Sequence, residues 1–121
     1  MQSRTIDAER RNGLTEPPLF LLAGEHAEEF EALAQECRER LRPDGPVEGF
    51  LVECMIHHDW GRRRFARVEL ELLKRRILGR GDEKKLDFVE HVLRSLERAW
   101  MSAFKELRRL QKRRGLTAEV R

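Results

Sequence analysis

The chain has 121 residues, of which 39% are charged and 40% hydrophobic, with a net charge of +3 and a sequence pI near 9.2. This length suits one domain with one modest core, and the composition favours a helical protein over a β-sandwich or a disordered chain. The longest early apolar run, at residues 19–23, is too short for a signal-peptide core or a membrane span, so we expect no membrane contact.

Residues 1–24 are polar and show no hydrophobic period, so an extended N-terminal arm is expected there. A first helix is predicted at about residues 26–41, and the Pro-Asp-Gly-Pro segment at 43–46 ends it. Its apolar residues recur at helical spacing: Phe30, Leu33, Cys37 and Leu41. Beyond the arm, residues 25–121 are expected to form a single helical domain.

Two long helices are predicted next, at about residues 46–78 and 83–114, with the Gly-Arg-Gly-Asp segment at 79–82 between them. Pro46 suits the first turn of one helix, and Gly115 is expected to end the other. A short break between two helices of this length predicts an antiparallel hairpin with coiled-coil-like packing. The predicted fold is therefore all-α, a three-helix bundle made of a long hairpin and a shorter N-terminal helix.

The hairpin also predicts which residues meet along its seam. Folding at residues 80–81 pairs positions whose numbers add up to about 161, so Leu72 is expected opposite Val89. Gly61 is then expected opposite Trp100, and a close fit there would explain a glycine that costs a helix about 1 kcal/mol relative to alanine. A kink at residues 59–61 is the alternative, and we favour the continuous helix.

A second apolar stripe lies near the predicted hairpin tip, beyond the reach of a first helix only about 24 Å long. Large exposed apolar patches are interaction sites, and a second copy of the chain is the simplest cover, so we expect a homodimer. The predicted interface consists of Ala66, Leu70, Leu73, Ile77, Phe88 and Val92.

Several segments resemble a group of short, functionally uncharacterised bacterial helical proteins. The matching segments are residues 22–25 with 28–30, 41–43 with 45–46, Glu48 with 51–53, residues 96–98 and 106–107 through 110–114, together with Trp60, Arg63, Arg64, Arg67 and Glu69. The resemblance covers roughly residues 11–115 and brings no known activity. Gly61 and the His-His-Asp segment at 57–59 depart from the group's pattern, which implies that this segment is not a shared catalytic element.

The His-His-Asp segment at 57–59 raises the question of a metal site. Consecutive helical residues point about 100° apart, so these three side chains cannot converge on one ion. We expect His58 on the seam opposite Ala103 and His57 on the surface. Cys37 and Cys54 show no ligand spacing and indicate a reducing, cytoplasmic compartment. No nucleophile or phosphate-loop motif occurs, so we expect no enzyme, metal, cofactor or small-molecule substrate.

Charge is distributed unevenly along the chain. Residues 25–45 hold seven acids and three arginines, whereas residues 62–80 hold eight bases and two acids, and residues 94–121 nine bases and three acids. Arginine binds phosphate well, so the first hypothesis is a small accessory protein that binds DNA or RNA. The predicted contacts are Arg62, Arg63, Arg64, Arg67, Arg108, Arg109, Lys112, Arg113 and Arg114. The alternative is a helical oligomerisation or adaptor module without a nucleic-acid role, whose bases solvate the helices or pair with the acidic first helix.

Overall fold

The computed structural model describes residues 21–22 and 24–120, with side chains described as far as Gly115. Its elements are three helices, α1 (Ala27–Leu41), α2 (Gly45–Ile77) and α3 (Glu83–Val120), so the all-α prediction is confirmed. The expected arm at residues 1–24 lies almost wholly outside the described residues. None of the described helices is long and apolar enough to cross a membrane.

The chain divides into two units, Met1–Ala32 and Leu33–Arg121, with the boundary inside α1. In the described part of the first unit, the Glu25 N–H donates to the Leu22 carbonyl oxygen at 3.0 Å and forms a turn. The helix begins directly after it, with Glu28 and Glu29 in its first turn. Acidic side chains are favourable there because they face the positive end of the helix dipole.

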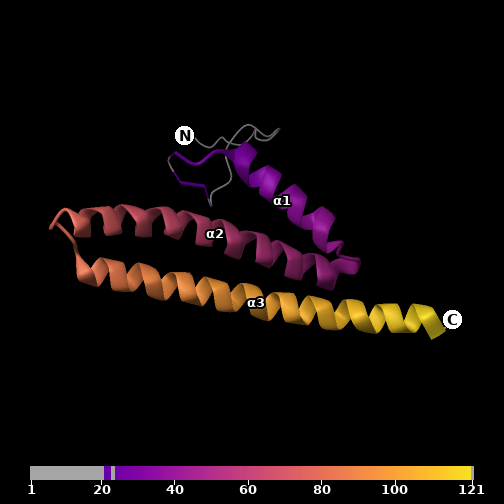
Figure 1. Cartoon of the computed structure of the whole chain (residues 1–121). Coiled ribbons are helices and arrows are strands. Elements are labelled where there is room, and N and C mark those ends of the chain that lie inside the picture. Colours follow the sequence, from indigo (N-terminus) through magenta and orange to yellow (C-terminus); the bar gives the residue numbers. More distant parts are fainter. Residues whose placement is uncertain (1–20, 23, 121) are drawn as a thin grey trace, which may run out of the picture. The chain divides into compact units, whose positions relative to one another are not determined.

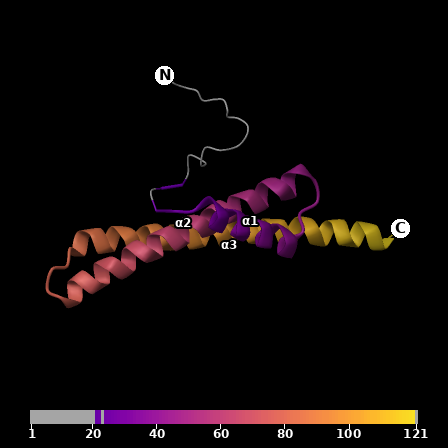
Figure 2. The same cartoon turned by 90° about the horizontal axis from the view of Figure 1, so that it is seen from above.

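In the second unit, α2 and α3 lie side by side in opposite directions and are joined by a short turn (Figures 1 and 2). Gly79 adopts a φ of +78°, which a glycine tolerates without a Cβ clash. A Cβ at Gly81 would lie 2.9 Å from the Cα of Arg76, so the chain can approach itself closely only with glycine there. Asp82 then accepts a hydrogen bond from the Lys85 N–H at 3.2 Å and caps the start of α3.

Apolar side chains fill the seam between the two long helices. Towards the turn, Leu72, Leu86 and Val89 form a buried cluster, so the predicted meeting of Leu72 with Val89 is confirmed. Phe65, Leu73 and Leu93 pack against this cluster. Further along the hairpin the fully buried side chains are Val52, Met55, Ile56 and Leu107.

Two details of the predicted hairpin are wrong. A Cβ on Gly61 would meet the Leu96 side chain, with Cδ1 at 3.3 Å, so Leu96 and not Trp100 fits against the glycine. The side chain that fits against Gly61 is thus one turn away from the predicted one, although α2 does run unbroken through Gly61 as expected. In addition, α3 does not end at Gly115 but continues to Val120. Gly115 lacks the positive φ of a helix-ending glycine, and no proline follows it.

Candidate nucleic-acid interface

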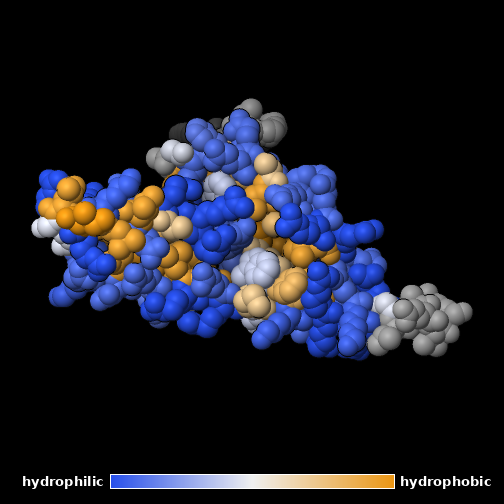
Figure 3. All heavy atoms as spheres, in the orientation of Figure 1, coloured by the Kyte–Doolittle hydropathy of each residue, from blue (hydrophilic) through white to orange (hydrophobic). Residues whose placement is uncertain are grey.

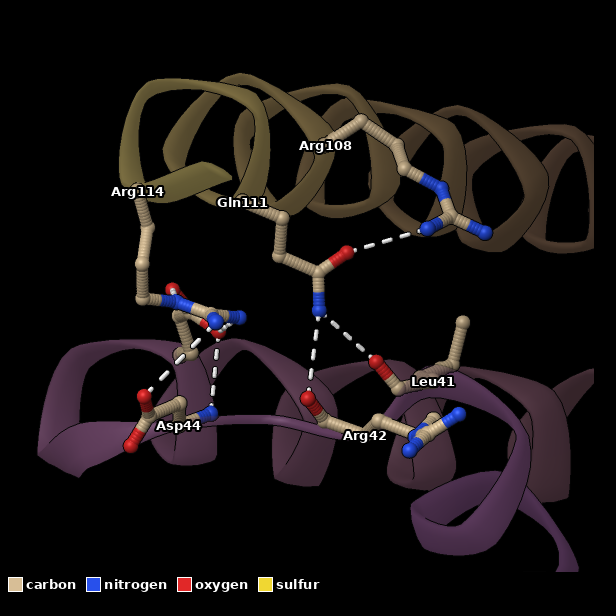
Figure 4. A network of polar contacts seen from close by, with 7 residues as sticks. Leu41, Arg42, Asp44, Arg108, Gln111 and Arg114 are labelled. Atoms are coloured by element: carbon tan, nitrogen blue, oxygen red, sulfur yellow. Dashed lines mark hydrogen bonds and ion pairs between the residues drawn. The ribbon is translucent and has the colours of Figure 1, made fainter. Parts of the chain in front are cut away.

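Arg114, the last arginine of the predicted basic set, is bound within the chain (Figure 4). Its guanidinium donates to both carboxylate oxygens of Glu48, from Nη2 at 3.0 Å and from Nε at 3.1 Å, and it lies 3.6 Å from a carboxylate oxygen of Asp44. Glu48 is only 5% exposed and also accepts the N–H of Asp44 at 2.9 Å. We call Asp44, Glu48, Gln111 and Arg114 the clasp, because they join α3 to the start of α2.

Gln111 extends the clasp to the end of α1. Its amide nitrogen donates to the carbonyl oxygens of Leu41 at 2.7 Å and Arg42 at 3.3 Å (Figure 4). These carbonyl groups lie at the C-terminus of a helix, where no intrahelical N–H is left to bind them. Arg42 adopts a φ of +52°, which reverses the chain after α1. The clasp therefore fixes the loop between α1 and α2 as well as the end of α3.

The charge of Glu48 is stabilised by its partners. The hydrogen bonds from Arg114 lower the pKa of Glu48 below its ordinary value of 4.5, although burial acts in the opposite direction. The same contact raises the pKa of Arg114. Both groups are therefore charged at neutral pH, and Arg114 is taken up by a structural ion pair.

The predicted arginines of α2 also interact with other residues of the chain. Arg62 donates to Asp59 at 2.7 Å, and Arg63 lies 3.6 Å from the other oxygen of the same carboxylate. Arg64 and Arg67 have interaction partners of their own. Asp59 thus neutralises part of this basic run from inside the His-His-Asp segment. In the described residues, no three His, Cys, Asp or Glu side chains gather in a way that could hold a metal ion.

The acidic first helix pairs with α2 at a different place. Arg38 of α1 binds Glu53 with two parallel hydrogen bonds, 2.8 Å from Nε and 3.0 Å from Nη2. This contact lowers the pKa of Glu53. The acids of α1 with a described partner, such as Glu36 with Arg40 at 2.8 Å, pair within their own helix. The described contacts therefore include no ion pair between the predicted basic residues and the acids of α1.

A row of bases runs along the side of α3 that faces away from α2. Successive helical residues are rotated by about 100°, which places these positions within about 60° of each other. The buried Val89 and Leu107 lie on the opposite side of the helix. The row, called the α3 stripe from here on, consists of Arg94, Arg98, Lys105, Arg109 and Lys112, all of them exposed.

Most of the α3 stripe carries unneutralised charge. Arg109 pairs with Glu106, and Arg98 donates to the Ser95 hydroxyl at 3.3 Å. Arg94, Lys105 and Lys112 form no ion pair with any residue that the structure describes. At 1.5 Å per residue, the stripe is about 27 Å long. Its first three members, Arg94, Arg98 and Lys105, were missed by the sequence analysis, although their spacing of four and seven residues places them on one helix face.

A row of aromatic side chains lies on α3 between its buried seam and the α3 stripe. The rings of Trp100 and Phe104 stack with centroids 5.1 Å apart, and the Arg108 guanidinium lies 5.0 Å from the centroid of Phe104. Next to this ladder is a pocket of about 500 Å³ between α2 and α3. Its lining residues are His58, Asp59, Arg62, Leu96, Glu97, Trp100 and Met101. A basic surface with aromatic rings at its edge is typical of nucleic-acid binding.

The predicted oligomer interface lies at the hairpin tip, where apolar side chains gather at the surface (Figure 3). Leu70, Ile77 and Phe88 are 53%, 84% and 62% exposed, and Leu78 adds to them at 65%. Leu73 instead packs against the cluster of Leu72, Leu86 and Val89, and Ala66 and Val92 are half-buried. Part of the predicted stripe therefore belongs to the hairpin core and part is open.

Cys37 and Cys54 are free thiols and half-buried. Burial, then the charges of Asp59 and Glu36, raise the pKa of the Cys37 thiol. A raised pKa keeps a thiol protonated, and the thiolate is the nucleophilic form. The surroundings of Cys37 therefore suppress its reactivity.

Comparison with protein-family models, with curated proteins and with solved structures finds no match to this chain. The resemblance to short bacterial helical proteins stays a prediction.

Proposed function

We propose that the protein is a small non-enzymatic accessory protein that binds the phosphate backbone of nucleic acid along the α3 stripe. The supporting observation is the row of five exposed bases on one helix face, of which Arg94, Lys105 and Lys112 have no acid partner among the described residues. Residues 94–113 hold seven bases and only two acids. Such a surface gains affinity by releasing the counterions condensed on a polyanion.

The predicted contacts on α2, and Arg114 on α3, have a smaller part in this proposal. Arg62 and Arg63 share the charge of Asp59, so a phosphate would have to compete with a carboxylate already in place. Arg114 would have to leave a buried Glu48 unpaired, which is costly. Arg108, Lys112 and Arg113 remain in the proposed surface, as does Arg109, which pairs with Glu106. Arg94, Arg98 and Lys105 extend it.

Fluorescence anisotropy with labelled DNA and RNA of mixed sequence, beginning at about 50 mM salt, tests the proposal. Binding should weaken steeply with salt. Changing Arg94, Lys105 and Lys112 to glutamine should lower the slope of log K against log salt by about 2 for a single strand and about 3 for a duplex. Absence of binding at about 50 mM salt would overturn the proposal.

A control variant with the same change of net charge separates the stripe from general attraction. Lys74, Arg75 and Arg80 lie near the hairpin tip and are exposed. Their replacement by glutamine should leave the salt slope within about 1 of the wild-type slope, since only contacted phosphates release counterions. Equal losses in both variants would mean that the stripe is not the contact surface.

Self-association through the hairpin tip is a second candidate, favoured by the exposure of Ile77, Leu78 and Phe88. Residues 74–85 hold six bases and two acids, so two tips that meet would repel each other electrostatically. Salt should therefore strengthen a tip dimer while it weakens phosphate binding. Sedimentation at micromolar concentration should show a dimer that Leu70→Lys reduces, and a monomer at low and high salt would refute this candidate.

A further inference from the structure

The pocket between α2 and α3 differs from the α3 stripe in chemistry. Leu96, Trp100 and Met101 give it apolar and aromatic walls, and Met101 is 46% exposed at its edge. Two carboxylates, Asp59 and Glu97, also line it, together with Arg62, which is already bound to Asp59. Carboxylates repel phosphate, so this pocket is unsuited to the sugar-phosphate backbone that the stripe would bind.

The same features suit a nucleobase. A base presents a flat ring, which stacks on an aromatic side chain, and an edge with N–H groups that a carboxylate accepts. Asp59 is already held by Arg62 and Arg63, but Glu97 makes no hydrogen bond or ion pair with a described residue. The pocket therefore offers an aromatic ring beside an acceptor that is free to bind an N–H donor.

The pocket and the stripe lie on different sides of α3 and are linked by a row of side chains along the helix. Trp100 and Phe104 are stacked, and Arg108 covers Phe104, so this ladder leads along α3 from the pocket to the basic residues. Lys112 of the stripe follows Arg108 one turn further along this same row, whereas Arg98 and Lys105 lie on the other side of the helix from Trp100. A strand whose phosphates lie on Lys112 and Arg108 would thus bring a base along the row to the mouth of the pocket.

We infer that this pocket binds a nucleobase of single-stranded nucleic acid, stacked near Trp100, while the phosphates of the same strand follow the α3 stripe. The inference rests on the proposed function and narrows it from nucleic acid to the single strand. In a duplex the bases are stacked and paired inside the helix, so entry would require unpairing. Glu97 further favours bases with exposed N–H donors, cytosine and guanine among them.

Three probes of equal length test the inference: a single-stranded oligonucleotide of mixed sequence, its duplex, and an abasic strand with the same phosphates but no bases. The single strand should bind at least tenfold more tightly than the abasic strand at about 50 mM salt. Equal affinity for these two probes would overturn the inference and leave the proposed function standing. Absence of binding to all three would overturn the proposed function itself.

Variants of Trp100 locate the site. Trp100→Ala should weaken binding of the single strand by about five- to 150-fold, the usual effect of removing one stacked base, and should leave the abasic affinity unchanged. Trp100→Phe keeps a flat ring and should restore most of the loss. Because the abasic probe needs only the folded stripe, a loss of abasic binding would reveal misfolding. The wild-type comparison of the probes decides the inference in that case.

Discussion

Replacement of Glu48 by glutamine tests whether the clasp stabilises the fold. The carboxylate accepts two hydrogen bonds from Arg114 and one from the Asp44 N–H, and the residue is 5% exposed. Glutamine keeps the size of the side chain and one oxygen acceptor, but it removes the charge and places an amide NH₂ group near the guanidinium. The change therefore breaks the ion pair without opening a cavity.

The expected cost follows from the number of bonds that are lost. Hydrogen bonds to charged groups contribute about 1.5–3 kcal/mol each. The Arg114 side chain is 44% exposed, so water takes over part of its hydrogen bonding when the carboxylate is gone. The remaining oxygen can still accept the Asp44 N–H. We expect Glu48→Gln to lower the free energy of unfolding by about 2 kcal/mol, which shifts Tm by about 6–12 °C for a domain of this size.

Thermal and urea unfolding followed by circular dichroism at neutral pH measures this difference. Glu36→Gln is the matched control, because it removes the same group from an exposed pair with Arg40 within α1. Exposed pairs of this kind contribute at most about 0.5 kcal/mol, so the control should remain close to wild type. Equal effects of the two substitutions would refute the assignment of a stabilising role to the clasp.

The clasp should also make stability depend on pH in a defined direction. Arg114 lowers the pKa of Glu48 below 4.5, so the folded chain holds this proton less readily than the unfolded chain. The contribution is therefore present above about pH 4.5 and is lost as the pH falls through the lower folded value. Wild type should lose more stability below pH 4.5 than Glu48→Gln does. Glu53, paired with Arg38, acts in the same direction in both proteins and cancels in the difference. Parallel pH curves would refute the reasoning.

Two further substitution and reactivity measurements test the interior. Gly61→Ala should change the free energy of unfolding by less than about 1 kcal/mol, because the helical preference of alanine is offset by a 3.3 Å contact with Leu96. Gly61→Val should lower the free energy of unfolding by about 1–3 kcal/mol, because its larger side chain does not fit against Leu96. Urea unfolding measures both changes, and a valine variant as stable as wild type would contradict the close fit. Cys37 should react with iodoacetamide more slowly in the folded protein at pH 8 than in urea, since its pKa is raised; peptide mapping after timed alkylation measures the rate, and equal rates would show that the thiol is not protected.

The long hairpin could be predicted because several local signals agree. Heptad spacing, the glycines at 79 and 81 and the absence of proline between them and Pro46 all favour two long antiparallel helices. The exact partner of Gly61 could not be predicted, because a side chain in such a seam fits between positions of the facing helix. A difference of one turn then decides between Leu96 and Trp100. The continuation of α3 beyond Gly115 was not predicted, because glycine often ends a helix and only the absence of a following proline argued against an end there.

The candidate site was predicted only in part, because the prediction relied on dense runs of bases in the sequence. Neighbouring residues in a run such as Arg62, Arg63 and Arg64 point about 100° apart, so a dense run does not define one surface. The α3 stripe is sparse in sequence and continuous in space. The predicted seam already defined which side of this helix is buried. The stripe could therefore have been predicted from the angular positions of the bases around the helix. The role of Arg114 was not, because its partner Glu48 lies 66 positions away.

The two long helices differ in how much surface they leave free. In the second unit, α2 packs along α3 and is also tied to the last part of α1 through Arg38 and Glu53. By contrast, α3 packs along α2 alone among the described helices and is bonded to the end of α1 through Gln111. The side of α3 opposite its seam is therefore an unbroken helical surface backed by a packed partner. A row of bases on one helix face suits a repeating charge such as a phosphate backbone, because the helix fixes the spacing of the backbone positions from which the cationic side chains extend.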